Sequence, residues 1–396
     1  MRSSVLRDPA FLRLWVGTTA SGLATWSLPF LLGLAVLDRT LDGAGLGLAL
    51  AARTVGFLAA VPVAGVLADR YSRRDVVGAS SAAAAVASPL VAWGMGTSTA
   101  LVVLAAAVVG AGQGACRPAF QALTAEVVAA EQRQTANAAT TIAVRVSTLV
   151  GPSAAALAAL VVDTRTLVAC TGALWLVAAL LPPRGAGRAE RTEHVGFHRE
   201  FAEGLGEARR HPWFVSGLGA LTAVIATGYS ATGVALPLVS RDRYDSEVVL
   251  AAATTAYTAG ALVGAFLIAR WRPAAPGRVA LLGLAVYAVA PLALWLPVPA
   301  AVVVAAYAVT GVGIELFNVP WFTAVQREVE PRLLARVSSV DFLFSYGLAP
   351  LGLALIAPAM AGIGTGPVLA ACAGVCLVAP LLALLAPGAA RFATAR

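Results

Sequence analysis

The amino-acid sequence predicts an all-α membrane protein with twelve transmembrane helices arranged as two six-helix bundles. Hydrophobic residues make up 59% of the 396 residues and charged residues only 12%, whereas soluble domains contain about 45–50% and about 25%. So little charge cannot cover a soluble surface of this size, which excludes an ordinary soluble enzyme and a disordered chain. The apolar runs are long and rich in Ala, Leu and Val, unlike the alternating segments of a β-barrel.

Twelve apolar runs are long enough to cross the roughly 30 Å of membrane hydrocarbon, for which a helix needs about 20 residues. The first run is too long for a cleavable signal peptide, so we expect it to remain as a helix. The runs cover residues 13–37, 44–68, 76–95, 99–125, 136–161, 165–181, 213–239, 248–269, 278–296, 298–326, 336–360 and 366–386.

The basic residues predict the orientation of these helices. All 28 are arginines, of which 21 lie on or near one side of the predicted membrane, four on or near the other side, and three deep within runs. The positive-inside rule therefore predicts that both termini are cytoplasmic. This distribution explains the net charge of +8 without a nucleic-acid partner. The lack of Lys and the abundance of Ala and Arg favour a bacterial source, and hence the bacterial cell membrane.

One long polar stretch divides the chain in the middle. We expect an N-terminal six-helix bundle over residues 1–181, a cytoplasmic linker over 182–212, and a C-terminal six-helix bundle over 213–396. Within the linker, residues 197–210 have the pattern of a short amphipathic helix.

A weak internal repeat relates the two halves. Small residues, a proline and a glutamate recur at an offset of 201–202 residues, which favours duplication of a six-helix unit, a known transporter design. Because chance matches are easy in a sequence rich in Ala and Gly, twelve unrelated helices remain the alternative. The matching residues are Gly110, Gly112, Pro118 and Glu126 in the first half and Gly311, Gly313, Pro320 and Glu328 in the second.

The loop after the second run contains the strongest local motif, which includes Gly65, Asp69, Arg70, Arg73 and Arg74. It resembles the loop signature G-x-x-x-D-R/K-x-G-R-R/K of the major facilitator superfamily, with Ser72 in place of the second glycine. The resemblance implies the major facilitator fold, and it implies that Arg73 pairs with Glu126 in an inner latch. A basic loop that serves only topology is the alternative.

Further stretches resemble one branch of that family, the macrolide-efflux and enterobactin-exporter type of permease. They include residues 7–15, residues 117–123 and Arg53. The resemblance implies proton-coupled export of bulky amphipathic compounds. Gly151 and Pro152 are similar to the antiporter motif of the family and are expected to kink their helix, although Ser147, Ala155 and Ala156 replace glycines. Thr25 stands where this branch commonly has an acid, so an uncoupled member is a further alternative.

Charged residues inside predicted spans are functional candidates because burying each one costs about 2.5–3.5 kcal/mol on insertion scales. Glu315 lies 13 residues before Glu328, or roughly 20 Å along a helix, and is our candidate for proton coupling. A static ion pair is the alternative role. In the fold that the resemblance implies, Glu315 and Arg117 face each other across a cavity. Asp341 lies near the inner end, where it would reach water or help the latch.

The expected substrate cavity contains charged, amide and aromatic side chains. Each of these also has a structural interpretation, as an interhelical contact or as packing. The cavity candidates are Arg53, Arg117, Arg145, Asn318, Trp26 and Tyr229.

These features predict a secondary transporter that exports a drug-like, siderophore-like or secondary-metabolite compound by alternating access. A proton-coupled importer of a sugar or organic acid is the alternative function. A membrane enzyme or sensor lacks support because no catalytic constellation and no soluble domain is present. We expect a monomer without a cofactor. No Walker motif occurs, so we expect the proton gradient and not ATP to drive transport. The four cysteines and three histidines do not form a metal-binding pattern, so no metal is expected.

Overall fold

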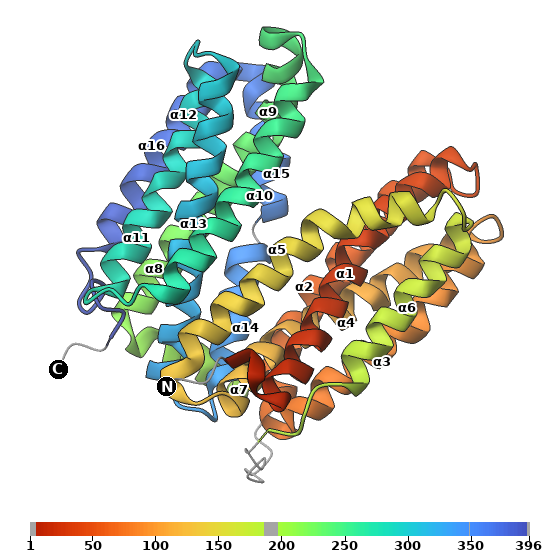
Figure 1. Ribbon diagram of the computed structural model, residues 1–396, viewed down its shortest axis with the longest axis horizontal. Helices are drawn as coiled ribbons and strands as arrows, with labels where there is room; N and C mark the ends of the chain where they lie inside the picture. Colours follow the sequence, from red (N-terminus) through yellow and green to blue (C-terminus); the bar gives the residue numbers. More distant parts are fainter. Residues whose placement is uncertain (1–4, 186–196, 348, 394–396) are drawn as a thin grey trace. The chain divides into compact units, whose positions relative to one another are not determined.

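A computed structural model describes residues 5–185, 197–347 and 349–393, which form helices and the loops between them. The chain folds into two compact units (Figure 1). Unit 1 comprises Met1–Leu205 together with Glu330–Val340, and unit 2 comprises Gly206–Val329 together with Asp341–Arg396. The eleven-residue segment Glu330–Val340 thus packs with unit 1 although it follows most of unit 2 in the sequence.

The helices follow the predicted runs in order. Unit 1 contains η1 (Val5–Arg7), α1 (Pro9–Leu37), α2 (Gly43–Arg70), α3 (Arg73–Gly94), α4 (Thr99–Val127), η2 (Ala130–Gln132), α5 (Arg133–Ala158) and α6 (Thr164–Leu180). Unit 2 contains α8 (Pro212–Val224), η3 (Ile225–Tyr229), α9 (Ser230–Tyr244), α10 (Glu247–Arg270), α11 (Pro276–Ala285), η4 (Val286–Ala288), α12 (Val289–Trp295), α13 (Ala300–Glu328), α15 (Ala349–Ile363) and α16 (Thr365–Ala383). Two unit boundaries fall within α7 (Phe197–Arg210) and α14 (Leu334–Gly347), and the third follows the end of α13.

Length and composition agree with a membrane protein. Among the described residues, ten helical segments are long and apolar enough to cross a bilayer, and Thr164–Leu180 is a shorter apolar helix. Several helices begin earlier than the apolar runs because polar residues cap them. The Asp8 side chain accepts a hydrogen bond from the Ala10 amide at the start of α1, and Ser72 accepts one from the Asp75 amide at the start of α3. Such caps satisfy amides of the first turn that have no partner within the helix.

Two predicted spans are interrupted rather than continuous. The 278–296 run consists of α11, the 3₁₀ turn η4 and α12. Pro291 explains the turn, because its ring lacks an N–H and crowds the carbonyl of residue 287, four positions earlier. In the 213–239 run, the π-helical turn η3 joins α8 to α9. Such turns are rare and frequently occur at functional sites.

The glycines of the internal repeat occupy equivalent places in the two units. Gly110 of α4 lies against the Arg53 carbonyl of α2, and Gly311 of α13 lies against the Tyr257 carbonyl of α10. A methyl group at either glycine would overlap that carbonyl. Close approach of helices through small residues is typical of membrane proteins. The repeated glycines therefore have the same packing role in both halves.

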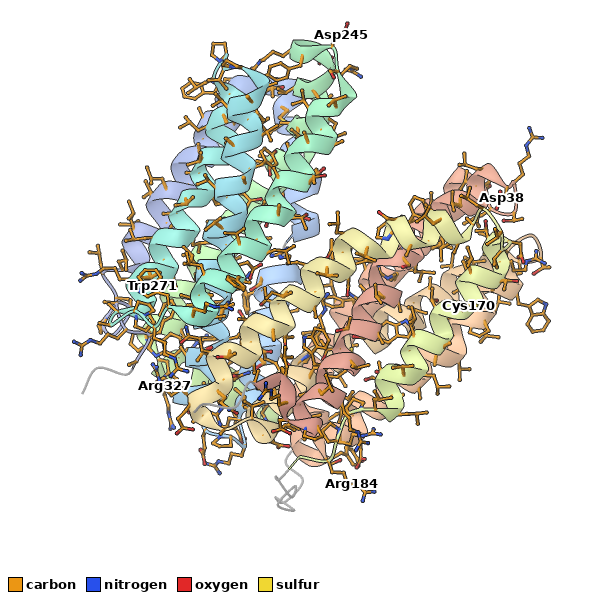
Figure 2. All side chains as sticks on the ribbon, in the orientation of Figure 1. Asp38, Cys170, Arg184, Asp245, Trp271 and Arg327 are labelled. Carbon is orange, nitrogen blue, oxygen red and sulfur yellow. The ribbon has the colours of Figure 1, made fainter. Side chains whose placement is uncertain are left out.

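The helices of each unit run between two ends. In unit 1, Asp38 lies at one end and Arg184 at the other, and in unit 2 Asp245 and Arg327 lie at opposite ends (Figure 2). The end of each unit that contains the named arginine is the one predicted to be cytoplasmic. The orientation in the membrane itself stays a prediction from the positive-inside rule.

Candidate functional site

Arg53 connects three helices of unit 1 from a partly buried position on α2. Its Nη2 donates a hydrogen bond to Gln113 Oε1 of α4 at 2.6 Å and to the Thr25 carbonyl of α1 at 3.1 Å. Both acceptors are neutral. Its Nε is buried and has no hydrogen-bond acceptor among the residues that the structure describes.

Arg117 and Arg145 lie on α4 and α5 of the same unit, and both are partly buried. The Arg117 guanidinium carbon lies 5.9 Å from the centroid of the Phe57 ring on α2, which is a cation–π distance. Arg117 is also close enough to Arg53 for the two positive charges to repel each other. The structure thus brings two of the three predicted intramembrane arginines together.

Thr25 and Trp26 supply the α1 side of this arginine pair. Thr25 is buried, and its contribution is the backbone carbonyl that accepts from Arg53. Trp26 is partly buried, and its Nε1 has no acceptor within the described part of the chain. An aromatic side chain with a free N–H can contact a ligand through both its ring and its donor.

Glu315 is the main charged residue in the middle of α13. Its side chain is fully buried, with 0% exposed surface, and Asn318 Nδ2 donates to its Oε2 at 3.4 Å. The sequence candidates Glu315 and Asn318 are therefore neighbours. Because Glu315 belongs to unit 2 and Arg117 to unit 1, their position across from each other stays a prediction.

Sequence reasoning identified Tyr229 but missed the cluster around it. Tyr229 is half exposed on η3, and the buried Tyr287 lies near Tyr229, Tyr257 and Tyr307. The Thr232 hydroxyl lies near the Tyr287 phenol and donates to the Gly228 carbonyl at 2.9 Å. These tyrosines lie on separate helices, so no local spacing in the sequence could have predicted the cluster.

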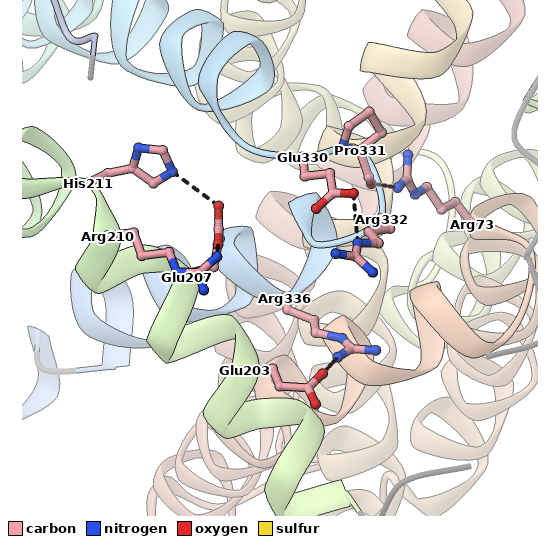
Figure 3. Close-up of polar contacts among 9 residues, drawn as sticks. All are labelled: Arg73, Glu203, Glu207, Arg210, His211, Glu330, Pro331, Arg332 and Arg336. Atoms are coloured by element: carbon pink, nitrogen blue, oxygen red, sulfur yellow. Dashed lines mark hydrogen bonds and ion pairs between the residues drawn. The ribbon is translucent and has the colours of Figure 1, made fainter. Parts of the chain in front are cut away.

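The inner end of unit 1 contains the predicted partners Arg73 and Glu126. Arg73 Nη1 lies 2.7 Å from Glu126 Oε1 and also donates to the Ala122 carbonyl at 3.3 Å. The Arg73 Nη2 donates to the carbonyl of Pro331, in the Glu330–Val340 segment (Figure 3). The structure thus brings Arg73 and Glu126 together, whereas their function as a latch stays a prediction.

Two further contacts hold the Glu330–Val340 segment in unit 1. A methyl group at Gly65 of α2 would lie 2.9 Å from Ser339 Cβ and 3.0 Å from the Ala335 carbonyl, so only glycine allows this approach. Arg336 Nη1 lies 2.8 Å from Glu203 Oε2 of α7 (Figure 3). The sequence did not predict the Arg336–Glu203 ion pair, because its members are 133 positions apart.

The remaining residues of the loop motif have different places. Arg74 Nη2 donates to the Leu180 carbonyl at the end of α6, at 3.1 Å. Asp69 and Arg70 end α2, but their side chains lie outside the described residues. Ser72 has a φ of −64° and caps α3, so this position does not require glycine and the cap compensates for the departure from the family pattern.

Gly151 and Pro152 lie inside the continuous helix α5. A methyl group at Gly151 would lie 3.2 Å from Ser27 Oγ of α1, and one at Gly22 would lie 3.1 Å from Ser147 Oγ of α5. The small residues of the degenerate motif therefore face α1 and allow the two helices to pack closely. The kink at Pro152 stays a prediction.

The expectation that Asp341 reaches water is wrong, whereas its contribution to a latch stays a prediction. Asp341 is 3% exposed and its Oδ1 accepts from Trp321 Nε1 at 3.3 Å and from Ser345 Oγ at 3.2 Å. Trp321 in turn stacks on Phe317, with ring centroids 5.3 Å apart, and contacts Phe392 near the C-terminus at 5.4 Å. Asp341 is therefore buried beside an aromatic cluster, whose tail residue Phe392 the sequence did not suggest.

Among the residues that the structure describes, no group of three His, Cys, Asp or Glu side chains could hold a metal ion.

Comparison with known sequences identifies a family and a set of relatives. The family model described as "Major Facilitator Superfamily" matches residues 14–353. The chain is similar to the multidrug efflux pump Tap of Mycobacterium tuberculosis, with 28% identity over 380 residues that cover 89% of this chain and 87% of the pump. Tap of Mycobacterium bovis has the same identity and coverage.

Comparison with solved structures supports the same fold. The human organic anion transporter MFSD10 (TETRAN) superimposes with a TM-score of 0.78 at 16% identity, over 95% of this chain and 99% of that one. A bacterial homologue of the iron transporter ferroportin, solved in an outward-facing state, gives a TM-score of 0.75 at 16% identity, over 94% of this chain and 97% of that one. At such low identity these likenesses show the fold alone.

Proposed function

The chain belongs to the major facilitator superfamily, and from this premise we propose that it exports an amphipathic compound in exchange for protons. It is a multi-pass membrane protein and a secondary transporter, not an enzyme. The proposed cargo is drug-like, siderophore-like or a secondary metabolite, and the proposed location is a bacterial cell membrane. The proposed branch is that of the macrolide and enterobactin exporters.

The single observation that carries the proposal is the burial of Glu315 in the middle of α13. A carboxylate with no exposed surface is costly inside a membrane protein, and such residues mark proton and substrate pathways. The neighbouring Asn318 can hydrogen-bond either protonation state, because its amide both donates and accepts. This contact is therefore compatible with the proposed role of Glu315 in proton coupling.

The export direction is supported by the mycobacterial relatives. They are named multidrug efflux pumps, and the similarity extends over 89% of this chain. The scarcity of asparagine also favours a largely apolar cargo over a sugar, because the sequence contains only two asparagines, Asn137 and Asn318. A sugar would need more hydrogen-bonding groups to replace its water.

The contacts of Arg73 support an inner latch in the proposed cycle. Arg73 bonds at once to Glu126 and to the Pro331 carbonyl, so it links α3, α4 and the Glu330–Val340 segment. Alternating access requires such contacts to break and reform as the inner side opens and closes. Buried charge-assisted bonds have the geometric specificity that a two-state contact needs.

The proposal is tested by efflux from cells that express the full chain. The probes are ethidium, carboxyfluorescein, erythromycin and Nile red, which differ in charge, and each is measured with and without a proton uncoupler. We expect uncoupler-sensitive efflux of at least one probe, and its loss in Glu315→Gln, which removes the titrating group but keeps the size. Efflux that is insensitive to both the uncoupler and the substitution would refute proton coupling at Glu315.

The matched control is Glu131→Gln, at an exposed site in η2, which should leave efflux unchanged. Probe uptake in place of efflux, inhibited by added sugars, would instead indicate an importer.

A further inference from the structure

Positive charge is concentrated in the membrane-spanning part of unit 1. Arg53, Arg117 and Arg145 lie within its helices, whereas the aspartates and glutamates of that part of the sequence lie at the helix ends or in loops. Arg53 follows Asp42, the N-cap of α2, by eleven residues, which is roughly 16 Å along a helix. The guanidinium is therefore well inside the span.

The hydrogen bonds of Arg53 leave its charge without a neutralising partner. Its acceptors are the Gln113 side chain and the Thr25 carbonyl, and no ion pair of Arg53 is present among the described residues. Arginine cannot discharge itself by losing a proton. A guanidinium in this setting is stable only if an anion or water also contacts it.

The neighbourhood of Arg53 increases this demand for an anion. Arg117 repels Arg53, and a negatively charged group near both would remove that repulsion. Two buried donors, Arg53 Nε and Trp26 Nε1, have no acceptor within the described part of the chain. Anionic oxygens are the acceptors that guanidinium groups bind best.

Aromatic side chains lie beside the charge. The Phe57 ring lies 5.9 Å from the Arg117 guanidinium carbon, and Trp26 directly follows Thr25, whose carbonyl binds Arg53. A ligand with a negative group and a flat apolar body would match both features.

We infer that the cargo is an amphipathic organic anion whose carboxylate or similar acidic group is bound by Arg53 with help from Arg117. This inference rests on the proposed export function and specifies the chemical class of its substrate. The contrary interpretation is that Arg53 only ties α1, α2 and α4 together through neutral hydrogen bonds. The two interpretations differ in what they predict for ligand charge.

The test compares two fluorescent probes of opposite charge on the purified full chain in detergent micelles. Binding of carboxyfluorescein, an organic anion, and of ethidium, an organic cation, is measured by fluorescence polarisation. We expect the wild type to bind carboxyfluorescein more tightly, and Arg53→Gln to weaken that binding about tenfold or more. Arg53→Lys keeps the charge but loses the planar fork, so it should give an intermediate affinity. The control Arg39→Gln, in the loop between α1 and α2, should have no effect.

Several outcomes would overturn the inference. These are tighter binding of ethidium than of carboxyfluorescein, no carboxyfluorescein binding to the wild type, or equal binding by Arg53→Gln. Arg53→Lys keeps the positive charge, so binding of carboxyfluorescein that is retained in Arg53→Lys and lost in Arg53→Gln reflects the loss of charge. Thermal melting of both variants shows directly whether either one is misfolded. Competition by phosphatidylglycerol that abolishes carboxyfluorescein binding would identify a lipid headgroup as the occupant and would also overturn the inference.

Transport in liposomes separates this inference from the proposed function. Proton-driven export of ethidium but not of carboxyfluorescein would leave the export function standing and refute the anionic cargo. Proton-driven export of carboxyfluorescein that is lost in Arg53→Gln supports both. Binding of carboxyfluorescein without any proton-driven movement would refute the export function while the anion site stands.

Discussion

Replacing Gly65 with alanine should detach the Glu330–Val340 segment from α2. The new methyl group would lie 2.9 Å from Ser339 Cβ and 3.0 Å from the Ala335 carbonyl, and neither atom can move by a simple side-chain rotation. Overpacking of this kind costs about 1–3 kcal/mol, which corresponds to a shift of about 5- to 150-fold between the attached and detached states. Gly47→Ala, on the same helix α2, is the matched control, because a methyl group at Gly47 would meet nothing within 4 Å.

The assay measures the exposure of Ser339, which is fully buried with 0% exposed surface. A single cysteine is introduced by Ser339→Cys after the four native cysteines have been replaced, and its reaction with a water-soluble maleimide is followed. We expect faster labelling and slower export in Gly65→Ala, and neither change in Gly47→Ala. Equal labelling rates in the two glycine variants would show that the contact at Gly65 does not hold the segment.

Three other predictions concern single side chains. Phe392→Ala should lower the free energy of unfolding by about 3–5 kcal/mol, because this ring has 0% exposed surface; an unchanged melting temperature would contradict its packing role. Asp341→Ala should lower the free energy of unfolding by about 1–3 kcal/mol because it leaves the Trp321 N–H without an acceptor. Asp341→Asn keeps the acceptor and should melt no lower than the wild type. Equal melting temperatures of the two variants would exclude that hydrogen bond as a source of stability. The pKa of Asp163 is lowered chiefly by a hydrogen bond from the Thr166 hydroxyl. The stabilisation of α6 by the Asp163 carboxylate is therefore fully present above the ordinary carboxyl pKa and is lost as the pH falls through the lowered pKa. Hydrogen exchange at the start of α6 should speed up in that low pH range in the wild type but not in Asp163→Asn.

The positions of most helices could be predicted because a membrane-spanning segment needs a long apolar run, which is visible in the sequence. The family resemblance also predicted the pairing of Arg73 with Glu126, and the two side chains form that ion pair. The polar caps were missed because Asp8 and Ser72 lie outside the apolar runs that define the spans. The effect of such caps is local, so a search for capping residues ahead of each run would have found them.

Other features could not be predicted because they depend on contacts between distant residues. Phe392 packs on Trp213 and Trp321 of two other helices, and no periodicity in the sequence indicates that a residue near the C-terminus joins that cluster. Asp341 was expected near water from its depth along the chain, but the partner that retains it is the Trp321 indole, twenty positions away. Depth along a helix predicts the level of a residue in the membrane but not the direction in which its side chain points.

The two units share a scaffold but differ in charge. Gly110 and Gly311 have the same packing role, yet the carbonyl that each one meets belongs to Arg53 in unit 1 and to Tyr257 in unit 2. The residues that allow close helix packing are thus alike in the two units, whereas the polar residues beside them differ. Unit 1 therefore contains the intramembrane arginines, and unit 2 the buried carboxylates Glu315 and Asp341. A cargo and a proton can thus be bound by groups of opposite charge on different units, and a variant that impairs one need not impair binding of the other. Arg53→Gln should accordingly weaken binding of an anionic probe, while any transport that remains should still depend on the proton gradient and on Glu315. An Arg53→Gln protein whose residual transport no longer responds to the proton gradient would contradict this separation.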